Sequence, residues 1–231
     1  MYNIILVDLD NTILDFDAAE EDSFRKIISE VGLKYSDDFL RQYQKINNSL
    51  WRKLEQGEIP RDIVLNTRFS DFFRLYDIYV DGIETEQLFR FYLDESSALV
   101  PNSEITLRKL KTLGKRIFSA SNGVYSTQVK RLTNAGIIDL FDGHFISEKV
   151  GYEKLSPKFF DFCKDNIAKF EIKSVIMVGD SPASDIKGAI YSGIDSCFYQ
   201  HNKNIKCEYA TYTITVIVEL VDITQSHKKS G

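Results

Sequence analysis

The chain has 231 residues, a length that suits one large domain or one domain that carries a smaller inserted one. Hydrophobic residues make up 43% of it and charged residues 27%, which excludes a chain that is mainly disordered, collagen-like or coiled coil. The formal net charge of −5 gives no sign of a nucleic-acid-binding surface, and no stretch approaches the roughly 18 apolar residues of a membrane span.

The predicted elements begin with a short buried strand at residues 3–7, where an apolar run ends in polar residues. Similar runs at residues 116–120, 175–178 and 196–199 predict three more strands. Helical patterns lie between these strands. Strands that alternate with helices predict an α/β fold with a doubly wound, Rossmann-like parallel sheet.

The region between the first two predicted strands contains helix after helix and no convincing strand. Helices are expected at residues 18–31, at 36–56, from Pro60 onward, and at 84–96. So much helix is too long for a simple crossover between two strands. We therefore predict an α/β catalytic core at residues 1–14 and 99–231, with an inserted helical cap at residues 15–98. The cap is expected over the carboxyl ends of the strands, where open α/β sheets bind ligands.

Two acidic residues follow the first predicted strand, in the sequence Asp8-Leu9-Asp10-Asn11-Thr12. Residues two apart in extended backbone point the same way, so the carboxylates of Asp8 and Asp10 are expected to project together. Adjacent carboxylates repel each other unless a proton or cation lies between them, and magnesium is a hard cation that suits them. A turn in which both acids are solvated fits this pentapeptide equally well.

The strand predicted at 175–178 also runs into acids, because Asp180 follows it directly and Asp185 stands five residues further on. Asp185 marks a helix start, where capping is a common role for aspartate. Gly179 leaves room for the close approach of another group. If the first and third strands are neighbours, Asp8, Asp10 and Asp180 converge on one cation.

Residues of opposite polarity follow the remaining strands. Ser121 and Asn122 come after residues 116–120, and their hydroxyl and amide groups can hydrogen-bond phosphate oxygens, although Ser-Asn-Gly is also a common turn. Lys154 lies in a loop just before a helix start at Ser156 and Pro157. A lysine in a loop is usually solvated, but the order and spacing of the whole set favour a place in the site.

In this order the four segments resemble the motifs of the haloacid dehalogenase-like (HAD) hydrolase superfamily, and the inserted helices resemble its α-helical cap. The likeness extends from Val7 to about Gly193. Within the superfamily, residues 8–20 resemble the pyrimidine 5′-nucleotidase subgroup that acts on noncanonical nucleotides. Further segments add to this likeness: Asn48-Ser49-Leu50-Trp51, Gly57-Glu58-Ile59 and Arg68-Phe69.

The resemblance implies a phosphatase, because the dehalogenase branch generally lacks an acid at the position of Asp10. It implies that Asp8 is the nucleophile, which forms an aspartyl-phosphate, and that Asp10 is the general acid and then the general base. It also implies a magnesium site, with these ligands or near neighbours: Asp8, Asp180 and Asp185 by their side chains and Asp10 by its main-chain carbonyl. The implied phosphate-binding residues are Ser121, Asn122 and Lys154, and the lysine would also neutralise Asp8.

Substrate specificity is expected to lie in the predicted cap. Candidate contacts with a base or sugar are Asn47, Trp51, Arg52, Arg61 and Arg68. Packing inside the cap explains Trp51 as well as base stacking does, and solvation explains the others. The leading prediction is a magnesium-dependent 5′-nucleotidase that acts on a small phosphorylated metabolite. The alternatives are a phosphatase for phosphoglycolate, a sugar phosphate or FMN, and a binding protein on the same scaffold.

Three scattered cysteines, Cys163, Cys197 and Cys207, match neither a disulfide framework nor a zinc site. The first residues lack the basic and long apolar segments of a signal peptide. We therefore expect a cytoplasmic protein, with neither nucleic acid nor membrane as a partner. The oligomeric state is left open.

Overall fold

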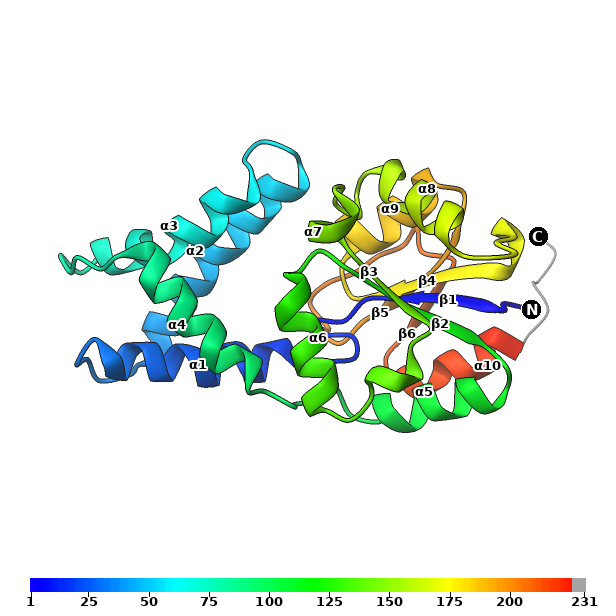
Figure 1. The fold of residues 1–231 in the computed structure, drawn as a ribbon, viewed down its shortest axis with the longest axis horizontal. Coiled ribbons are helices and arrows are strands. Elements are labelled where there is room, and N and C mark those ends of the chain that lie inside the picture. The colour runs from blue at the N-terminus through cyan, green and yellow to red at the C-terminus, as the bar shows by residue number, and fades with distance from the viewer. Residues whose placement is uncertain (226–231) are drawn as a thin grey trace. The chain divides into compact units, whose positions relative to one another are not determined.

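A computed structural model describes residues 1–225 of the chain (Figure 1). The chain divides into two compact units, which are described separately. The α/β unit consists of Met1–Phe16 and Ser97–Gly231, and the helical unit consists of Asp17–Ser96. No helix among the described residues is both long enough and apolar enough to cross a membrane.

The α/β unit is built on a single sheet of six parallel strands in the part of the chain that the structure describes. In chain order the strands are β1 (Ile4–Val7), β2 (Arg116–Ser121), β3 (Gly143–Ile146), β4 (Val175–Gly179), β5 (Asp195–Tyr199) and β6 (Tyr212–Ile214). Their order across the sheet is β3-β2-β1-β4-β5-β6, so the first strand lies at the centre. The predicted Rossmann-like fold is confirmed, and the sheet has two strands, β3 and β6, that the sequence did not predict.

Helices cover both faces of this sheet, which explains why its central strands are apolar on both sides. Ile5 and Val7 share one core cluster with residues of α5 and α10, whereas Ile4 and Leu6 share another with residues of α8 and α9. Figure 1 shows these two pairs of helices on opposite faces of the sheet. The helices of this unit are α5 (Ser103–Thr112), α6 (Tyr125–Asn134), α7 (Ser147–Val150), α8 (Pro157–Asn166), α9 (Lys187–Tyr191) and α10 (Leu220–Gln225).

The helical unit is held together by an aromatic core. Its helices are α1 (Phe16–Glu30), α2 (Asp37–Glu55), α3 (Arg61–Arg74) and α4 (Gly82–Asp94). The first residue of α1, Phe16, still belongs to the α/β unit. The ring of Tyr43 stacks between Phe24 and Phe69, with centroid distances of 4.7 and 5.0 Å, and all three residues are fully buried. Buried aromatic side chains contribute large apolar areas, so these contacts stabilise a unit that has no strand among its described residues.

The chain leaves the α/β unit and returns to it through two segments that pair with each other. Leu14 and Leu99 form an antiparallel bridge. The amide of Asp15 donates to the carbonyl of Ala98 at 3.0 Å, and the amide of Val100 donates to the carbonyl of Ile13 at 2.9 Å. The helical insertion therefore begins and ends at one place in the α/β unit.

Candidate active site

The site forms around Asp8, which directly follows the central strand. The amide of Asp8 still donates to the carbonyl of Val178 at 2.8 Å, so the strand pairing holds its backbone in place. The chain then turns sharply, because Asn11 adopts a left-handed conformation with a φ of 59°. The side-chain oxygen of Asn11 accepts a hydrogen bond from the amide of Phe16 at 3.1 Å, at the start of α1. Asp8 is buried at this turn, with only 5% of the residue exposed.

Lys154 lies between two buried carboxylates. Its Nζ forms ion pairs with Oδ1 of Asp8 and, at 2.6 Å, with Oδ1 of Asp185. The backbone amide of Lys154 donates to Oδ1 of Asn122 at 2.8 Å. A Cβ atom at position 188 would lie 2.1 Å from the carbonyl oxygen of Lys154, so Gly188 allows helix α9 to pack against this segment. The lysine predicted to be in the site is therefore fixed by both its side chain and its backbone.

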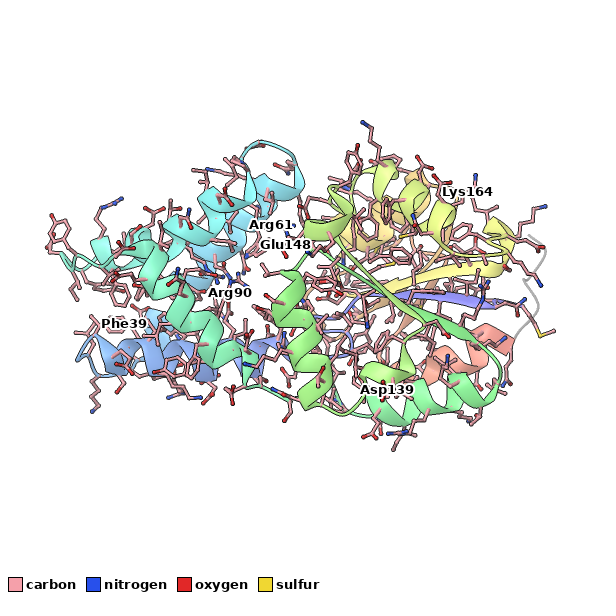
Figure 2. The ribbon with its side chains drawn as sticks, viewed as in Figure 1. Phe39, Arg61, Arg90, Asp139, Glu148 and Lys164 are labelled. Carbon is pink, nitrogen blue, oxygen red and sulfur yellow. The ribbon has the colours of Figure 1, made fainter. Side chains whose placement is uncertain are left out.

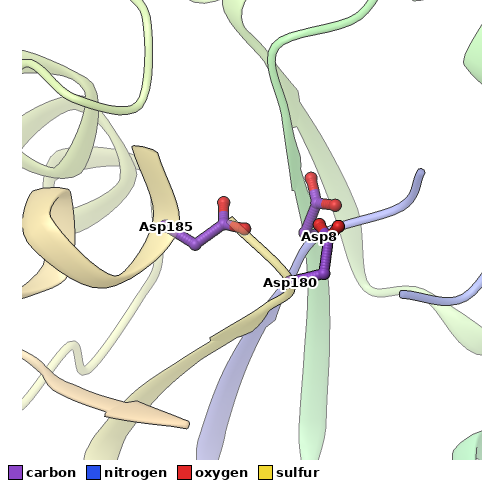
Figure 3. A group of neighbouring side chains, drawn as sticks. All are labelled: Asp8, Asp180 and Asp185. Carbon is purple, nitrogen blue, oxygen red and sulfur yellow. The ribbon is translucent and has the colours of Figure 1, made fainter. Parts of the chain in front are cut away.

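Three carboxylates gather at the carboxyl ends of β1 and β4 (Figure 3). One oxygen each from Asp8, Asp180 and Asp185 lies within 4.8 Å of the others. Asp185 packs directly against Gly179, where a Cβ atom would be 2.1 Å from its Oδ2. That same oxygen accepts a hydrogen bond from the amide of Ser181 at 3.0 Å. Glycine at position 179 is thus required by the position of the Asp185 carboxylate.

The electrostatics of this cluster favour a bound divalent cation. Burial raises the pKa of Asp8 well above its usual value, and the Lys154 ammonium only partly opposes this effect. Burial likewise raises the pKa of Asp185. Burial alone would lower the pKa of Lys154, but the charges of Asp185 and Asp8 outweigh it and raise that pKa. With Asp180 counted, the cluster holds three carboxyl groups and one ammonium. When all of them are ionised it carries two excess negative charges, which the oxygen-seeking Mg²⁺ matches.

Asp10 lies apart from the three-carboxylate cluster and has partners of its own. Its Oδ1 pairs with Nη1 of Arg131 at 2.6 Å, and its Oδ2 accepts a hydrogen bond from Nε2 of Gln128. The same Nε2 also contacts Oγ of Ser121 at 3.2 Å. Gln128 and Arg131 are not among the residues predicted from the sequence. Their spacing of three residues just after the Ser121-Asn122 segment was the available signal, because such residues share one helix face.

Five of the predicted residues of the α/β unit form one connected group, whereas Asp10 and Ser121 share Gln128 as a partner. Asp8, Lys154 and Asp185 are in direct contact, and Asp180 joins them in the carboxylate cluster. Asn122 is linked to this group through the backbone of Lys154. Two further contacts, which the sequence analysis did not foresee, complete the surroundings: Oγ1 of Thr12 donates to Oδ2 of Asp8 at 3.4 Å, and Nε2 of His201 lies 3.2 Å from Oδ2 of Asp180.

The predicted specificity residues all lie in the helical unit, in different environments. Asn47 and Arg68 are only 2% exposed and belong to an internal network. In that network Nδ2 of Asn47 donates to Oε1 of Glu20 at 2.9 Å, and Arg68 donates to Oδ1 of Asn47 at 3.0 Å and to both carboxylate oxygens of Glu86 at 2.7 and 2.9 Å. Glu86 also pairs with Arg90, which is labelled in Figure 2. These side chains are therefore engaged inside their own unit.

The other three specificity candidates are more accessible. Trp51 is half-buried on α2, and Arg52 beside it is exposed. Arg61 is half-buried at the first residue of α3 (Figure 2). A contact between any of these side chains and a substrate stays a prediction.

Comparison with known proteins places this geometry in a family. The family model for haloacid dehalogenase-like hydrolase matches residues 2–193. The chain is 34% identical to the HAD-hydrolase YfnB of Bacillus subtilis (strain 168), over 96% of this chain and 95% of YfnB. The crystal structure of magnesium-bound YfnB superposes with a TM-score of 0.91 at 33% identity, covering 97% of this chain and 99% of that one.

Two further relatives carry a more specific description. The chain is 31% identical to the pyrimidine 5′-nucleotidase PynA of Streptococcus pneumoniae (strain R6), over 96% of this chain and 94% of PynA. It is 26% identical to the pyrimidine 5′-nucleotidase YjjG of Escherichia coli (strain K12), over 96% of this chain and 98% of YjjG.

The Rossmann-like sheet, with its acids and lysine at the carboxyl ends of the strands, is the framework of an enzyme with an inserted helical unit. The chain belongs to the haloacid dehalogenase-like hydrolases. The resemblance drawn from the four motifs is thereby confirmed.

Proposed function

We propose that this protein is a magnesium-dependent phosphatase that hydrolyses nucleoside 5′-monophosphates, with a preference for pyrimidines. The two relatives named as pyrimidine 5′-nucleotidases, which align over nearly their whole length, support the choice of substrate. The observation that carries the proposal is the Asp8 carboxylate, buried beside Lys154, with a second acid, Asp10, two residues further along the same turn. We place the enzyme in the cytoplasm, because its three cysteines form no disulfide.

Asp8 is the proposed nucleophile of the first step. A carboxylate oxygen of Asp8 forms a bond to phosphorus while the bond between phosphorus and the ester oxygen breaks, which gives an aspartyl-phosphate. Asp10 donates its proton to the departing oxygen, because a nucleoside 5′-alkoxide is a poor leaving group. Lys154 compensates negative charge on Asp8 and on the transferring phosphoryl group.

Water completes the reaction in the second step. Asp10, now ionised, accepts a proton from water as the water oxygen bonds to phosphorus and the bond from phosphorus to Asp8 breaks. The products are the nucleoside and inorganic phosphate, and both aspartates return to their starting states. Ser121 and Asn122 are proposed to hydrogen-bond the phosphate oxygens that Lys154 does not contact.

The residues present suit a magnesium ion. Asp8, Asp180 and Asp185 offer three oxygen ligands in a cluster with two excess negative charges, and Asp10 would add its main-chain carbonyl. When bound, Mg²⁺ offsets the repulsion between the phosphate ester and the carboxylates and stabilises the transferring phosphoryl group. YfnB, whose structure holds magnesium, supports this assignment.

The proposal is tested by phosphate release from a panel of esters, with Mg²⁺ and again with a chelator. The panel contains pyrimidine and purine monophosphates, phosphoglycolate, sugar phosphates and FMN. We expect chelator-sensitive turnover that is fastest with pyrimidine monophosphates. The Asp8→Asn variant should lose turnover and keep its fold, whereas the matched control Asp139→Asn, at an exposed acid of the same unit, should keep both. Faster turnover of another ester would contradict the nucleotidase assignment, and folded protein that hydrolyses none would contradict the phosphatase assignment.

A further inference from the structure

Both oxygens of the Asp10 carboxylate are held by side chains from one helix. Nη1 of Arg131 lies 2.6 Å from Oδ1, and Nε2 of Gln128 donates to Oδ2. Gln128 and Arg131 stand three residues apart on α6, so their side chains emerge from the same helix face. A carboxylate fixed at both oxygens has its direction fixed as well, which a single hydrogen bond would not achieve.

The burial of these two residues indicates that the arrangement is more than a surface ion pair. Arg131 is 1% exposed and Gln128 is 2% exposed, whereas the side chain of Asp10 is 29% exposed. Within residues 1–225, Nε and Nη2 of Arg131 have no hydrogen-bond partner. Besides Asp10, the guanidinium has the ring of Phe16 beside it, 5.7 Å from the centroid. Burying a guanidinium with one ion pair and one ring contact is still costly, and replacing a buried ion pair by apolar residues is often neutral or stabilising. Stability alone therefore gives little reason for an arginine here.

Gln128 connects this arrangement to the Ser121 segment. Its Nε2 lies between Asp10 and Oγ of Ser121, which is 3.2 Å away. A Cβ atom at position 123 would lie 2.4 Å from this Nε2. The absence of a side chain at Gly123, the glycine of the Ser-Asn-Gly segment, therefore leaves the space in which the Gln128 amide reaches Asp10.

We propose that Arg131 and Gln128 are positioning residues that orient the Asp10 carboxyl group for proton transfer. The inference rests on the proposed function, because it assigns these residues to the acid and base of that reaction. Asp10 delivers its proton to the ester oxygen in the first step and takes one from water in the second. Arg131 and Gln128 act through Asp10 and make no bond to the substrate in either step.

This role makes the effect of a substitution depend on the leaving group. A nucleoside alkoxide needs the Asp10 proton, whereas p-nitrophenolate leaves without one. Loss of positioning should therefore slow the first step with a nucleoside 5′-monophosphate and spare the first step with p-nitrophenyl phosphate. The second step, attack by water, is common to both esters and should slow equally. A purely structural role would change the first step of both esters by the same factor.

The experiment compares Arg131→Met, Arg131→Lys and Gln128→Met with the wild type and with Lys130→Met, an exposed cation on the same helix. Rapid-quench kinetics with Mg²⁺ measure aspartyl-phosphate formation from UMP and from p-nitrophenyl phosphate. For Arg131→Met we expect about a 100-fold slower first step with UMP and an unchanged KM. With p-nitrophenyl phosphate we expect a burst of p-nitrophenolate equal to the enzyme concentration, followed by slow turnover. Arg131→Lys should recover part of the rate, and Lys130→Met should match the wild type.

An equal loss with both esters, or no loss in any folded variant, would overturn the positioning role. Thermal unfolding identifies variants that fail to fold. If Arg131→Met is one of them, Gln128→Met, which keeps the arginine, decides the question by the same leaving-group comparison. Failure of the proposed function is distinct from these results, because the wild type itself would then form no aspartyl-phosphate from either ester, and the inference would fall with it.

Discussion

A single buried acid, Glu20, should make the stability of the helical unit depend on pH. Glu20 lies on α1 and is 3% exposed, and its carboxylate accepts hydrogen bonds from Asn47 at 2.9 Å and from Gln44 at 3.0 Å. Burial raises the pKa of Glu20 from its usual 4.5 to about 7, although the Gln44 hydrogen bond and the Arg68 charge act in the opposite direction. The buried carboxyl group is therefore partly protonated at neutral pH.

The size and sign of the effect follow from this difference in pKa. Between pH 4.5 and about 7 the folded state holds a proton on Glu20 that the unfolded chain has released. The free energy of unfolding therefore falls as the pH rises through this window. Each pH unit corresponds to about 1.4 kcal/mol, so the loss amounts to about 3 kcal/mol once the pH has passed 7.

Glu20→Gln removes this titration while keeping the shape of the side chain. The new amide has one acceptor instead of two, so one of the two hydrogen bonds must rearrange, at a cost of about 1 kcal/mol at every pH. The free energy of unfolding of the variant should therefore match that of the wild type near pH 5. At that pH the wild type has already lost about 1 kcal/mol of the stabilisation that the protonated Glu20 contributes. At pH 8 the variant should be about 2 kcal/mol more stable than the wild type.

Trp51 provides the assay, because it is the only tryptophan of the chain and lies on α2 of the same unit. Its fluorescence during urea unfolding, measured from pH 5 to pH 8, yields the free energy of unfolding for each variant. Glu58→Gln, at an exposed acid of this unit, is the matched control and should follow the wild type. A difference between Glu20→Gln and the wild type that is the same at pH 5 and pH 8 would refute the reasoning.

Three other outcomes concern the carboxylate cluster. Gly179→Ala would place a Cβ atom 2.1 Å from Oδ2 of Asp185, so phosphate release should fall about 100-fold; activity within a factor of two of the wild type would show that Asp185 need not keep its place. Lys154→Met leaves the carboxylates of Asp8 and Asp185 buried without their cation, so the free energy of unfolding by urea, measured with a chelator, should fall by about 3–5 kcal/mol. Mg²⁺ should restore part of this loss. An identical loss with Mg²⁺ would argue against binding of the metal by the carboxylates that Lys154 contacts. Mg²⁺ at 100 times its Kd should raise the free energy of unfolding by about 2.7 kcal/mol, and Asp180→Asn should weaken that response, whereas equal thermal shifts in both proteins would exclude Asp180 as a ligand.

The sheet could be predicted from the sequence where its strands are apolar and buried, and not at its edges. The four predicted strands occupy the interior of the sheet, and all their residues are buried except the first residues of β2 and β5. Both missed strands are edge strands. β3 has four residues, begins with Gly143 and is half-exposed at its start, and β6 has three residues. Runs this short with mixed polarity carry no periodic signal, and tertiary pairing decides their conformation.

The convergence of the site residues was predictable because they follow the apolar interior strands of the sheet. Val7 lies opposite Val178 in the β1–β4 register, so the acids that follow these strands meet at one edge of the sheet. The directions of side chains on helices were not predictable to this degree. Gln128 and Arg131 are polar residues on an amphipathic helix, a pattern that normally marks a solvated face. Both contact Asp10, which is more than 100 residues away in the sequence.

The internal role of Asn47 and Arg68 was also not predictable, because their partners lie on other helices. Each is a polar residue on an amphipathic helix, where contact with solvent or ligand is the simplest expectation. Their partner Glu20 stands 27 residues before Asn47, and Glu86 stands 18 residues after Arg68. Only the packing of four helices brings these polar side chains together.

The paired segments around Leu14 and Leu99 have an evolutionary consequence. Since the outgoing and returning chain are hydrogen-bonded to each other within the α/β unit, residues 17–96 form an excursion with its two ends at one place. Insertions of this kind can be lengthened, shortened or exchanged without any change in the register of the host sheet. A lineage can therefore alter the helices while inheriting the acids and the lysine of the α/β unit unchanged.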